Sequence, residues 1–292
     1  MILIRSTVMG FCAGVQAAVI KVNEALEQGE RMHLPVYTIG PLIHNPSYMS
    51  YLEEQGVSVI ETPKDAPVGI AVIRAHGIPA INKKQFEKAG FRLIDGTCSR
   101  VINSQRIVHE YSMKHWSVVL AGDPGHAEVY AVAGAAEVPK AVCVVHDPKD
   151  LDKVDLDKPL VLLSQTTFSR EKFSAIADIL SDRVHRRNGV ITVIESICPS
   201  TANRQNALYQ LCSRVDAIVV IGGKNSSNTR RLYELAIACG KRSWLINGVE
   251  EVTSEMLCIE RLGITAGAST PAWLIKEIED RLQNLHEADT EQ

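Results

Sequence analysis

Short apolar runs alternate with stretches of helical periodicity along the whole chain. Runs typical of strands begin at Met1, Tyr37, Ala71, Phe91, Val118, Leu160, Val190, Ile218 and Leu262. Between these runs apolar residues recur at the spacing of one helix face, as Val15, Val19, Val22 and Leu26 do. Strands that alternate with helices are typical of an α/β fold with mostly parallel sheets.

Three cysteines occupy the same local setting in three different thirds of the chain. Cys12, Cys98 and Cys198 each follow a strand-like run and open a helix-like run. This puts each thiol at the carboxyl end of a strand and beside a helix N-terminus, where parallel sheets place ligands and the helix dipole favours a thiolate. Three thiolates supply three of the four ligands of an iron–sulfur cluster and leave one metal position for a substrate. Zinc is the rival metal, but the Cys-x-x-Cys pairs usual in structural zinc sites do not occur in the sequence.

A cysteine followed by two polar strand ends occurs three times along the chain, which suggests a weak threefold repeat. Each cysteine unit is followed by two further strand-like runs that end in small or polar residues. We therefore expect three lobes with boundaries near residues 95 and 194, namely 1–94, 95–193 and 194–292. The other four cysteines lie in apolar or unremarkable surroundings, and we interpret them as small apolar residues: Cys143, Cys212, Cys239 and Cys258.

Polar residues at the ends of the strand-like runs indicate an anion site. His44, His76 and His126 are placed on the same predicted rim as the thiols, and histidine donors there suit an anionic ligand. The run Asn225-Ser226-Ser227-Asn228 precedes a helix-like stretch; it can cap that helix and also bind a phosphate. Ser269 ends the run that begins at Leu262 and offers a similar donor.

One carboxylate on this rim has a histidine beside it. Glu128 follows His126 by two residues and is the natural general acid next to an open iron. Thr166 and Gln165 end another strand-like run and could position Glu128 or a substrate hydroxyl. The chain contains no Walker A motif and no complete Rossmann glycine fingerprint, so we do not expect ATP or a nicotinamide cofactor bound in the usual way.

Composition limits the possible partners and compartments. A net charge of −3 gives no reason to expect nucleic acid or an anionic membrane as partner. No apolar stretch reaches the roughly 18 residues of a membrane span, and the chain starts directly on a strand-like run, so we expect no signal peptide. Seven widely scattered cysteines do not resemble a secreted disulfide framework. We expect a reduced, cytoplasmic protein.

Taken together, nine ordered motifs resemble the LytB/IspH family of 4-hydroxy-3-methylbut-2-enyl diphosphate reductases, which catalyse the last step of the methylerythritol phosphate route to isoprenoids. The resemblance extends from Gly10 to about Leu282. The motifs are Gly10–Val15, Ile43–Asn45, Ala75–Gly77, Asp95–Cys98, Gly125–Val129, Gln165–Thr167, Ile197–Gln205, Lys224–Asn228 and Thr265–Ser269.

The resemblance implies a fold, a cofactor and a set of site residues. The fold is a trefoil of three pseudo-symmetric α/β lobes around a central cavity. The cofactor is a [4Fe–4S] cluster held by Cys12, Cys98 and Cys198, with one iron open. Glu128 delivers protons with His126 nearby, and Thr166 helps to place the substrate hydroxyl. The implied diphosphate pocket consists of His44, His76, His126, Ser226, Ser227, Asn228 and Ser269.

The implied reaction removes an allylic hydroxyl with two electrons and two protons, giving isopentenyl and dimethylallyl diphosphate. Because the sequence shows no second cluster motif and no flavin signature, the resemblance implies an external donor, a ferredoxin or flavodoxin. Two alternatives stay open: an open-cluster iron–sulfur dehydratase or hydratase acting on another small anionic substrate, and a cluster-based redox sensor. A sensor of the DNA-binding kind would need a basic helix or arm, and none is evident.

Overall fold

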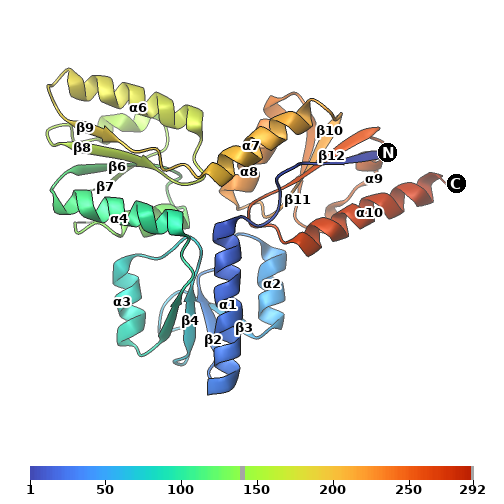
Figure 1. Ribbon diagram of the computed structural model, residues 1–292, viewed down its shortest axis with the longest axis horizontal. Helices are drawn as coiled ribbons and strands as arrows, with labels where there is room; N and C mark the ends of the chain where they lie inside the picture. The colour runs from blue at the N-terminus through green and yellow to red at the C-terminus, as the bar shows by residue number, and fades with distance from the viewer. Residues whose placement is uncertain (139–141, 291–292) are drawn as a thin grey trace. The chain divides into compact units, whose positions relative to one another are not determined.

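The computed structural model describes residues 1–138 and 142–290, in which strands and helices alternate along the chain (Figure 1). The strands of these residues form three four-stranded sheets, and the nine strand pairs within them are all parallel. The strands are β1 (Ile2–Arg5), β2 (Val36–Ile39), β3 (Val57–Ile60), β4 (Ile70–Ile73), β5 (Arg92–Asp95), β6 (Ser117–Ala121), β7 (Val142–Val145), β8 (Leu160–Ser164), β9 (Ile191–Val193), β10 (Ala217–Ile221), β11 (Arg242–Ile246) and β12 (Arg261–Ala266). The predicted α/β class with three parallel-sheet lobes is confirmed; their arrangement as a trefoil around a cavity stays a prediction.

Helices connect the parallel strands, as parallel pairing requires. The α-helices are α1 (Ala13–Met32), α2 (Pro46–Glu54), α3 (Ala80–Lys88), α4 (Ser99–Met113), α5 (Ala127–Ala133), α6 (Arg170–His185), α7 (Pro199–Cys212), α8 (Ser227–Ala238), α9 (Ser254–Leu257) and α10 (Ala272–Thr290), and the 3₁₀-helices are η2 (Pro148–Lys153) and η3 (Val249–Glu251). Local capping residues fix several starts. Asn45 accepts a hydrogen bond from the Tyr48 N–H at the start of α2, and Ser169 accepts one from the Lys172 N–H at the start of α6.

The three sheets share one topology. Their strand orders are β3-β2-β4-β5, β7-β6-β8-β9 and β11-β10-β12-β1. In each sheet the two central strands are the first and third of three consecutive strands: β2 and β4, β6 and β8, or β10 and β12. The second of the three forms one edge, and a fourth strand (β5, β9 or β1) forms the other edge. The predicted threefold repeat therefore has a structural counterpart in strand order.

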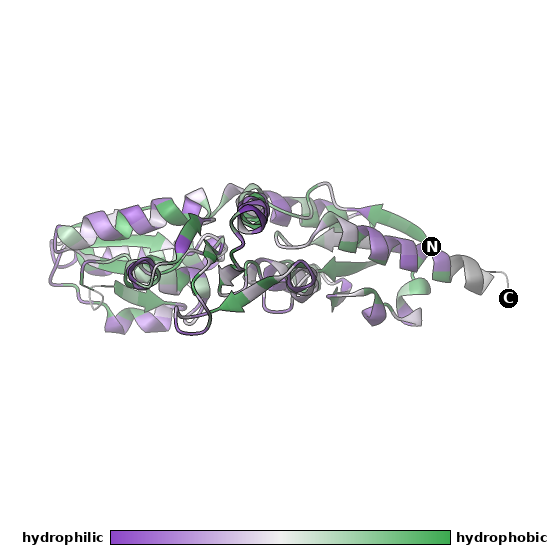
Figure 2. Ribbon diagram, turned by 90° about the horizontal axis from the view of Figure 1, so that it is seen from below, coloured by the Kyte–Doolittle hydropathy of each residue, from purple (hydrophilic) through white to green (hydrophobic). Residues whose placement is uncertain are grey.

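Each sheet is buried between helices, which explains the continuous apolar strands. In β6, Val118 and Leu120 belong to the core that α4 and α5 cover, whereas Val119 and Ala121 belong to the core that α6 covers. All four side chains are fully buried. In Figure 2 most strands are coloured as hydrophobic, while the helices carry both hydrophobic and hydrophilic residues.

The N-terminal strand corrects the predicted lobe boundaries. The segment 1–94 was expected to form one lobe, but β1 pairs with β12, with Leu3 opposite Leu262. After β12 the chain passes directly into α10, so the edge of β12 would expose unpaired backbone groups if β1 did not pair with it. The fourth strands of the other two sheets, β5 and β9, do end near the expected boundaries at 95 and 194.

The chain divides into two compact units. Unit 1 consists of residues 1–16, 43–56 and 199–292 and contains the sheet of β1, β10, β11 and β12. Unit 2 consists of residues 17–42 and 57–198 and contains the other two sheets.

Candidate active site

The three cysteines of interest have equivalent backbone surroundings. Each follows the fourth, edge strand of a sheet: β1, β5 or β9. Each donates its backbone N–H to the carbonyl oxygen of the residue two positions beyond the third strand of that sheet. These N···O distances are 3.1 Å from Cys12 to Ala268, 3.0 Å from Cys98 to Ala75 and 2.8 Å from Cys198 to Thr166. The same hydrogen bond, made three times, holds each cysteine at the carboxyl end of its sheet.

Each of these cysteines also stands at the start of a helix. Cys12 directly precedes α1, Cys98 is the N-cap of α4, and Cys198 directly precedes α7. The Cys12 sulfur accepts a backbone N–H bond from Val15 at 3.4 Å. Unpaired N–H groups and the positive helix end stabilise a thiolate, the form that binds iron. Three soft thiolate donors of this kind fit an iron–sulfur group. Cys12 belongs to unit 1, and Cys98 and Cys198 belong to unit 2.

Within unit 2 the structure brings Glu128 and Thr166 into direct contact. Glu128 is only 3% exposed. Its Oε1 accepts the Thr166 backbone N–H at 2.6 Å, and its Oε2 accepts the Thr166 hydroxyl at 2.7 Å. Burial raises the pKa of Glu128, and the nearby Asp123 charge raises it further, while the two Thr166 bonds oppose this shift. Burial outweighs the hydrogen bonds, so this carboxyl holds a proton more readily than an ordinary glutamate does.

His126 and His76 lie side by side in the same unit. Their rings meet edge to face with centroids 5.3 Å apart. His126 caps α5, and its Nδ1 accepts the Glu128 backbone N–H at 3.1 Å. An accepting Nδ1 carries no proton, which leaves Nε2–H as the donor of the neutral ring. The predicted cluster of His126, Glu128 and Thr166 is therefore present, and His76 joins it.

Within unit 1 the remaining donors gather around the backbone of His44. The Ser269 hydroxyl donates to the His44 carbonyl at 3.4 Å. A Cβ at Gly223 would collide with the same carbonyl, so the segment before Ser226 passes directly against His44. Ser226 caps α8 by accepting the Thr229 N–H at 3.3 Å, and Ser227 is the first residue of that helix.

The side-chain amide of Asn228 indicates which kind of ligand this donor set could bind. It lies in the first turn of α8 and is 5% exposed, and its Nδ2 has no hydrogen-bond partner among the described residues. A buried amide donor without a partner is rare in folded proteins. Beside a helix N-terminus, an anionic ligand would satisfy it.

Two features of the site were not singled out by the sequence. Arg204 on α7 is 3% exposed and donates to the Gly10 carbonyl at 2.6 Å, two residues before Cys12. It also donates to the carbonyl and the hydroxyl of Ser200, one turn earlier on α7. The signal in the sequence that could have identified Arg204 as buried was its position on the apolar face of α7, four residues before Leu208. The second feature is the approach of His146 Nδ1 to Asp123 Oδ1, at 3.0 Å, between two residues that are far apart in the sequence.

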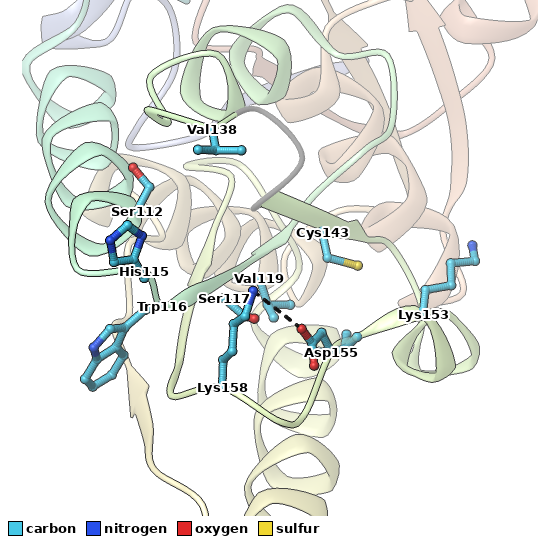
Figure 3. Close-up of a pocket in the computed structure, with 11 residues that line it drawn as sticks. Ser112, His115, Trp116, Ser117, Val119, Val138, Cys143, Lys153, Asp155 and Lys158 are labelled. Atoms are coloured by element: carbon cyan, nitrogen blue, oxygen red, sulfur yellow. Dashed lines mark ion pairs between the residues drawn. The ribbon is translucent and has the colours of Figure 1, made fainter.

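A separate cavity of about 280 Å³ lies elsewhere in unit 2 (Figure 3). It is lined at the amino-terminal end of β6 by Ser117, and also by Cys143 and Lys158. This is the sheet end opposite to the one where His126 and Glu128 follow β6. None of the predicted site residues lines it.

Among the described residues, no helix has the length and apolar character needed to cross a membrane.

Comparisons with known proteins agree with this geometry. The 4-hydroxy-3-methylbut-2-enyl diphosphate reductase of Treponema denticola is 40% identical, and the match covers 97% of this chain and 99% of that protein. The protein of the same name from Aquifex aeolicus is 33% identical, over 95% of this chain and 94% of that protein.

Solved structures give the same result. The E-1-hydroxy-2-methyl-but-2-enyl-4-diphosphate reductase of Plasmodium falciparum matches with a TM-score of 0.86 and 29% identity, covering 97% of this chain and 87% of that chain. A structure of (E)-4-hydroxy-3-methyl-but-2-enyl diphosphate reductase, described as the terminal enzyme of the non-mevalonate pathway, matches with a TM-score of 0.72 and 33% identity, covering 97% of this chain and all of that chain. The sequence model of the LytB protein family matches residues 3–283, and the chain therefore belongs to this family.

Proposed function

We propose that this protein is a 4-hydroxy-3-methylbut-2-enyl diphosphate reductase, which removes the allylic hydroxyl of its substrate to give isopentenyl and dimethylallyl diphosphate. The names of its relatives support the activity. The observation that carries the proposal is the threefold-equivalent hydrogen bond of Cys12, Cys98 and Cys198, because three thiols held alike suit one shared cofactor. The seven free thiols suit a reduced, cytoplasmic compartment.

Cys12, Cys98 and Cys198 are the proposed ligands of a [4Fe–4S] cluster, and their three thiolates leave one iron position open. When bound, the cluster supplies single-electron transfer and a Lewis-acidic iron. The two electrons of each turnover come from an external donor, a ferredoxin or a flavodoxin. Ligation requires the thiolate form of a cysteine, and each of the three cysteines stands beside a helix N-terminus.

The proposed diphosphate ligands are side chains that donate hydrogen bonds, and several of them lie at helix N-termini. They are His44, His76, His126, Ser226, Ser227, Asn228 and Ser269. The buried Asn228 Nδ2 supports this role, since a diphosphate oxygen would give it a partner. Holding the diphosphate fixes a small substrate and so lowers the entropic part of the barrier.

Glu128 is the proposed proton donor, and Thr166 is the proposed positioning group. Hydroxide is a poor leaving group, so protonation of the hydroxyl oxygen allows it to leave as water. Burial raises the pKa of Glu128, which favours its protonated form, and it also excludes bulk water. The Thr166 hydroxyl can rotate between Glu128 and a substrate oxygen, because a hydroxyl both donates and accepts.

The test is anaerobic cluster reconstitution of the wild type and of Cys12→Ser, Cys98→Ser and Cys198→Ser, followed by Mössbauer spectra with and without the substrate. We expect a four-iron cluster with one distinct iron that changes when the substrate is added, and its loss in each variant. Cys258→Ser is the matched control, because Cys258 is exposed and should leave the spectrum unchanged.

Two other results would contradict parts of this proposal. If the Mössbauer spectrum of the cluster changes with a different hydroxylated anion and not with this substrate, the dehydratase or hydratase replaces the reductase as the proposed function. A chain that binds no iron under any condition would refute the shared role of the three cysteines.

A further inference from the structure

Two segments that carry predicted anion ligands lie side by side in unit 2. The loop 74–79 follows β4 and contains His76, and α5 begins directly after His126. The two histidine rings meet edge to face, with centroids 5.3 Å apart. A Cβ at Gly134, just after α5, would lie 2.6 Å from Pro79 Cβ, so the loop packs closely against this helix. The spacing of the two histidines therefore depends on what holds the loop to α5.

Gln105, on α4, binds both segments through one side-chain nitrogen. Its Nε2 donates to the Ile78 carbonyl at 3.2 Å and to the Ala131 carbonyl at 3.2 Å. The amide has two N–H groups, so it can donate one to each carbonyl. The opposite orientation of the amide would place Oε1 against two carbonyl oxygens, and these contacts therefore assign the nitrogen to this position.

Both carbonyls depend on a donor from outside their own segment. Because α5 ends at Ala133, the Ala131 carbonyl is among the last four of that helix, which lack an N–H partner within it. Ile78 lies in the loop between β4 and α3, where neither a strand nor a helix supplies a donor. Ala131 is 0% exposed and Ile78 is 7% exposed. Leaving a buried carbonyl unpaired is costly, and Gln105 satisfies both.

The start of α4 and Gln105 hold the loop on both sides of His76. The Cys98 N–H, directly before α4, donates to the Ala75 carbonyl at 3.0 Å. Gln105 donates to the carbonyl two positions after His76. Gly77 lies between these two bonds with a φ of +72°, and a Cβ there would lie 3.3 Å from Gln105 Nε2. Because glycine restricts the backbone least, these two bonds decide where His76 lies.

The start of α5 is held independently of Gln105. Glu128 accepts two hydrogen bonds from Thr166, and His126 accepts the Glu128 N–H. Loss of the Gln105 bonds would therefore release the loop of His76 from α5 and leave the contact of Glu128 with Thr166 in place. The effect should fall on the anion site and not on the proposed proton donor.

We propose that Gln105 is a positioning residue that fixes His76 against His126 and so sets the affinity of the site for a diphosphate group. The inference rests on the proposed function, in which both histidines bind the diphosphate. Two donors already held at a fixed spacing bind an anion without first losing conformational freedom. Gln105 acts through the carbonyls of Ile78 and Ala131.

The test measures binding of inorganic pyrophosphate and steady-state kinetics in the full chain with its reconstituted cluster. Gln105→Met keeps the length of the side chain and removes both donors, and Gln105→Glu places an oxygen against both carbonyls. We expect the Kd of pyrophosphate and the KM to rise by roughly tenfold in Gln105→Met and further in Gln105→Glu, with kcat changing by less than about twofold. Gln85→Met is the matched control, because Gln85 is an exposed glutamine of α3.

A second measurement is independent of the proposed reaction. In the full chain with labelled histidine rings, an NOE between His76 and His126, assigned by its loss in His76→Gln, reports their edge-to-face contact. We expect this NOE to be lost in Gln105→Met and kept in Gln85→Met.

The two measurements separate this inference from the proposed function. If the wild type reduces the substrate and Gln105→Met matches it in Kd, KM and NOE, the positioning role is refuted while the reductase stands. An NOE that is lost without a change in Kd also refutes it, because the spacing would then not control affinity. If the wild type neither reduces the substrate nor binds pyrophosphate but the NOE still depends on Gln105, the reductase fails and the positioning of His76 against His126 stands.

Discussion

Replacing Glu128 by glutamine should make the protein more stable at neutral pH while removing its proposed activity. The amide has nearly the same size as the carboxyl. Its oxygen can accept the Thr166 N–H, and its NH₂ can donate to the Thr166 hydroxyl, in place of the bonds of 2.6 and 2.7 Å that the carboxylate makes. The substitution therefore removes the charge and keeps both contacts.

The magnitude follows from two opposing contributions. A hydrogen bond to a charged group stabilises by roughly 1.5–3 kcal/mol, so the two Thr166 bonds together offset much of the several kcal/mol needed to bury an ion. The pKa of Glu128 is nevertheless raised, so the burial penalty is the larger of the two. We expect a net gain on the order of 1 kcal/mol for Glu128→Gln, which would raise Tm by about 2–4 °C in a chain of this size.

The pH dependence provides the sharper check. Because the folded-state pKa lies above the ordinary value of 4.5, Glu128 favours folding fully below that value and loses this contribution as pH rises through the folded pKa. Glutamine does not titrate. The stability difference should therefore be small below the ordinary value of 4.5 and grow as pH rises toward the folded-state pKa of Glu128. Calorimetric Tm values of the cluster-free wild type and variant across this range measure it. A glutamine variant that is less stable than the wild type at a pH above 4.5, or a difference that does not change with pH, would refute the reasoning.

Three further predictions concern the core, a buried cation and the anion site. Ile176→Ala should destabilise the chain by about 2–5 kcal/mol in urea unfolding because Ile176 is fully buried, whereas alanine at the more exposed Ile179 should change stability far less. Arg204→Met should cost about 1–3 kcal/mol by leaving the Gly10 carbonyl without this donor, and hydrogen exchange at the Cys12 amide should become faster; unchanged exchange would contradict its positioning of that segment. Asn228→Ala should raise KM, and the inhibition constant of pyrophosphate, by about tenfold with a smaller effect on kcat. A change in kcat alone would place Asn228 outside the diphosphate contacts.

Local signals in the sequence were sufficient for the class of fold and for most of the candidate site. Apolar runs that alternate with helical periodicity depend on neighbours a few residues away, so they predicted strands, helices and parallel pairing. The strand–cysteine–helix setting of Cys12, Cys98 and Cys198 is likewise local, and so is the capping run that contains Ser226 and Asn228. For this reason the sequence by itself determined the α/β class, the presence of three similar lobes and the identity of the candidate ligands.

Only the tertiary structure decided which distant segments meet. The pairing of β1 with β12 depends on an edge left open near the other end of the chain, and no local pattern reports that edge. The burial of Glu128, which sets the direction of its pKa shift, depends on Thr166 and on the strands around it. Arg204 and the Asp123–His146 pair resemble ordinary surface charges in the sequence, because a charge acquires its role from partners that folding brings to within about 3 Å of it.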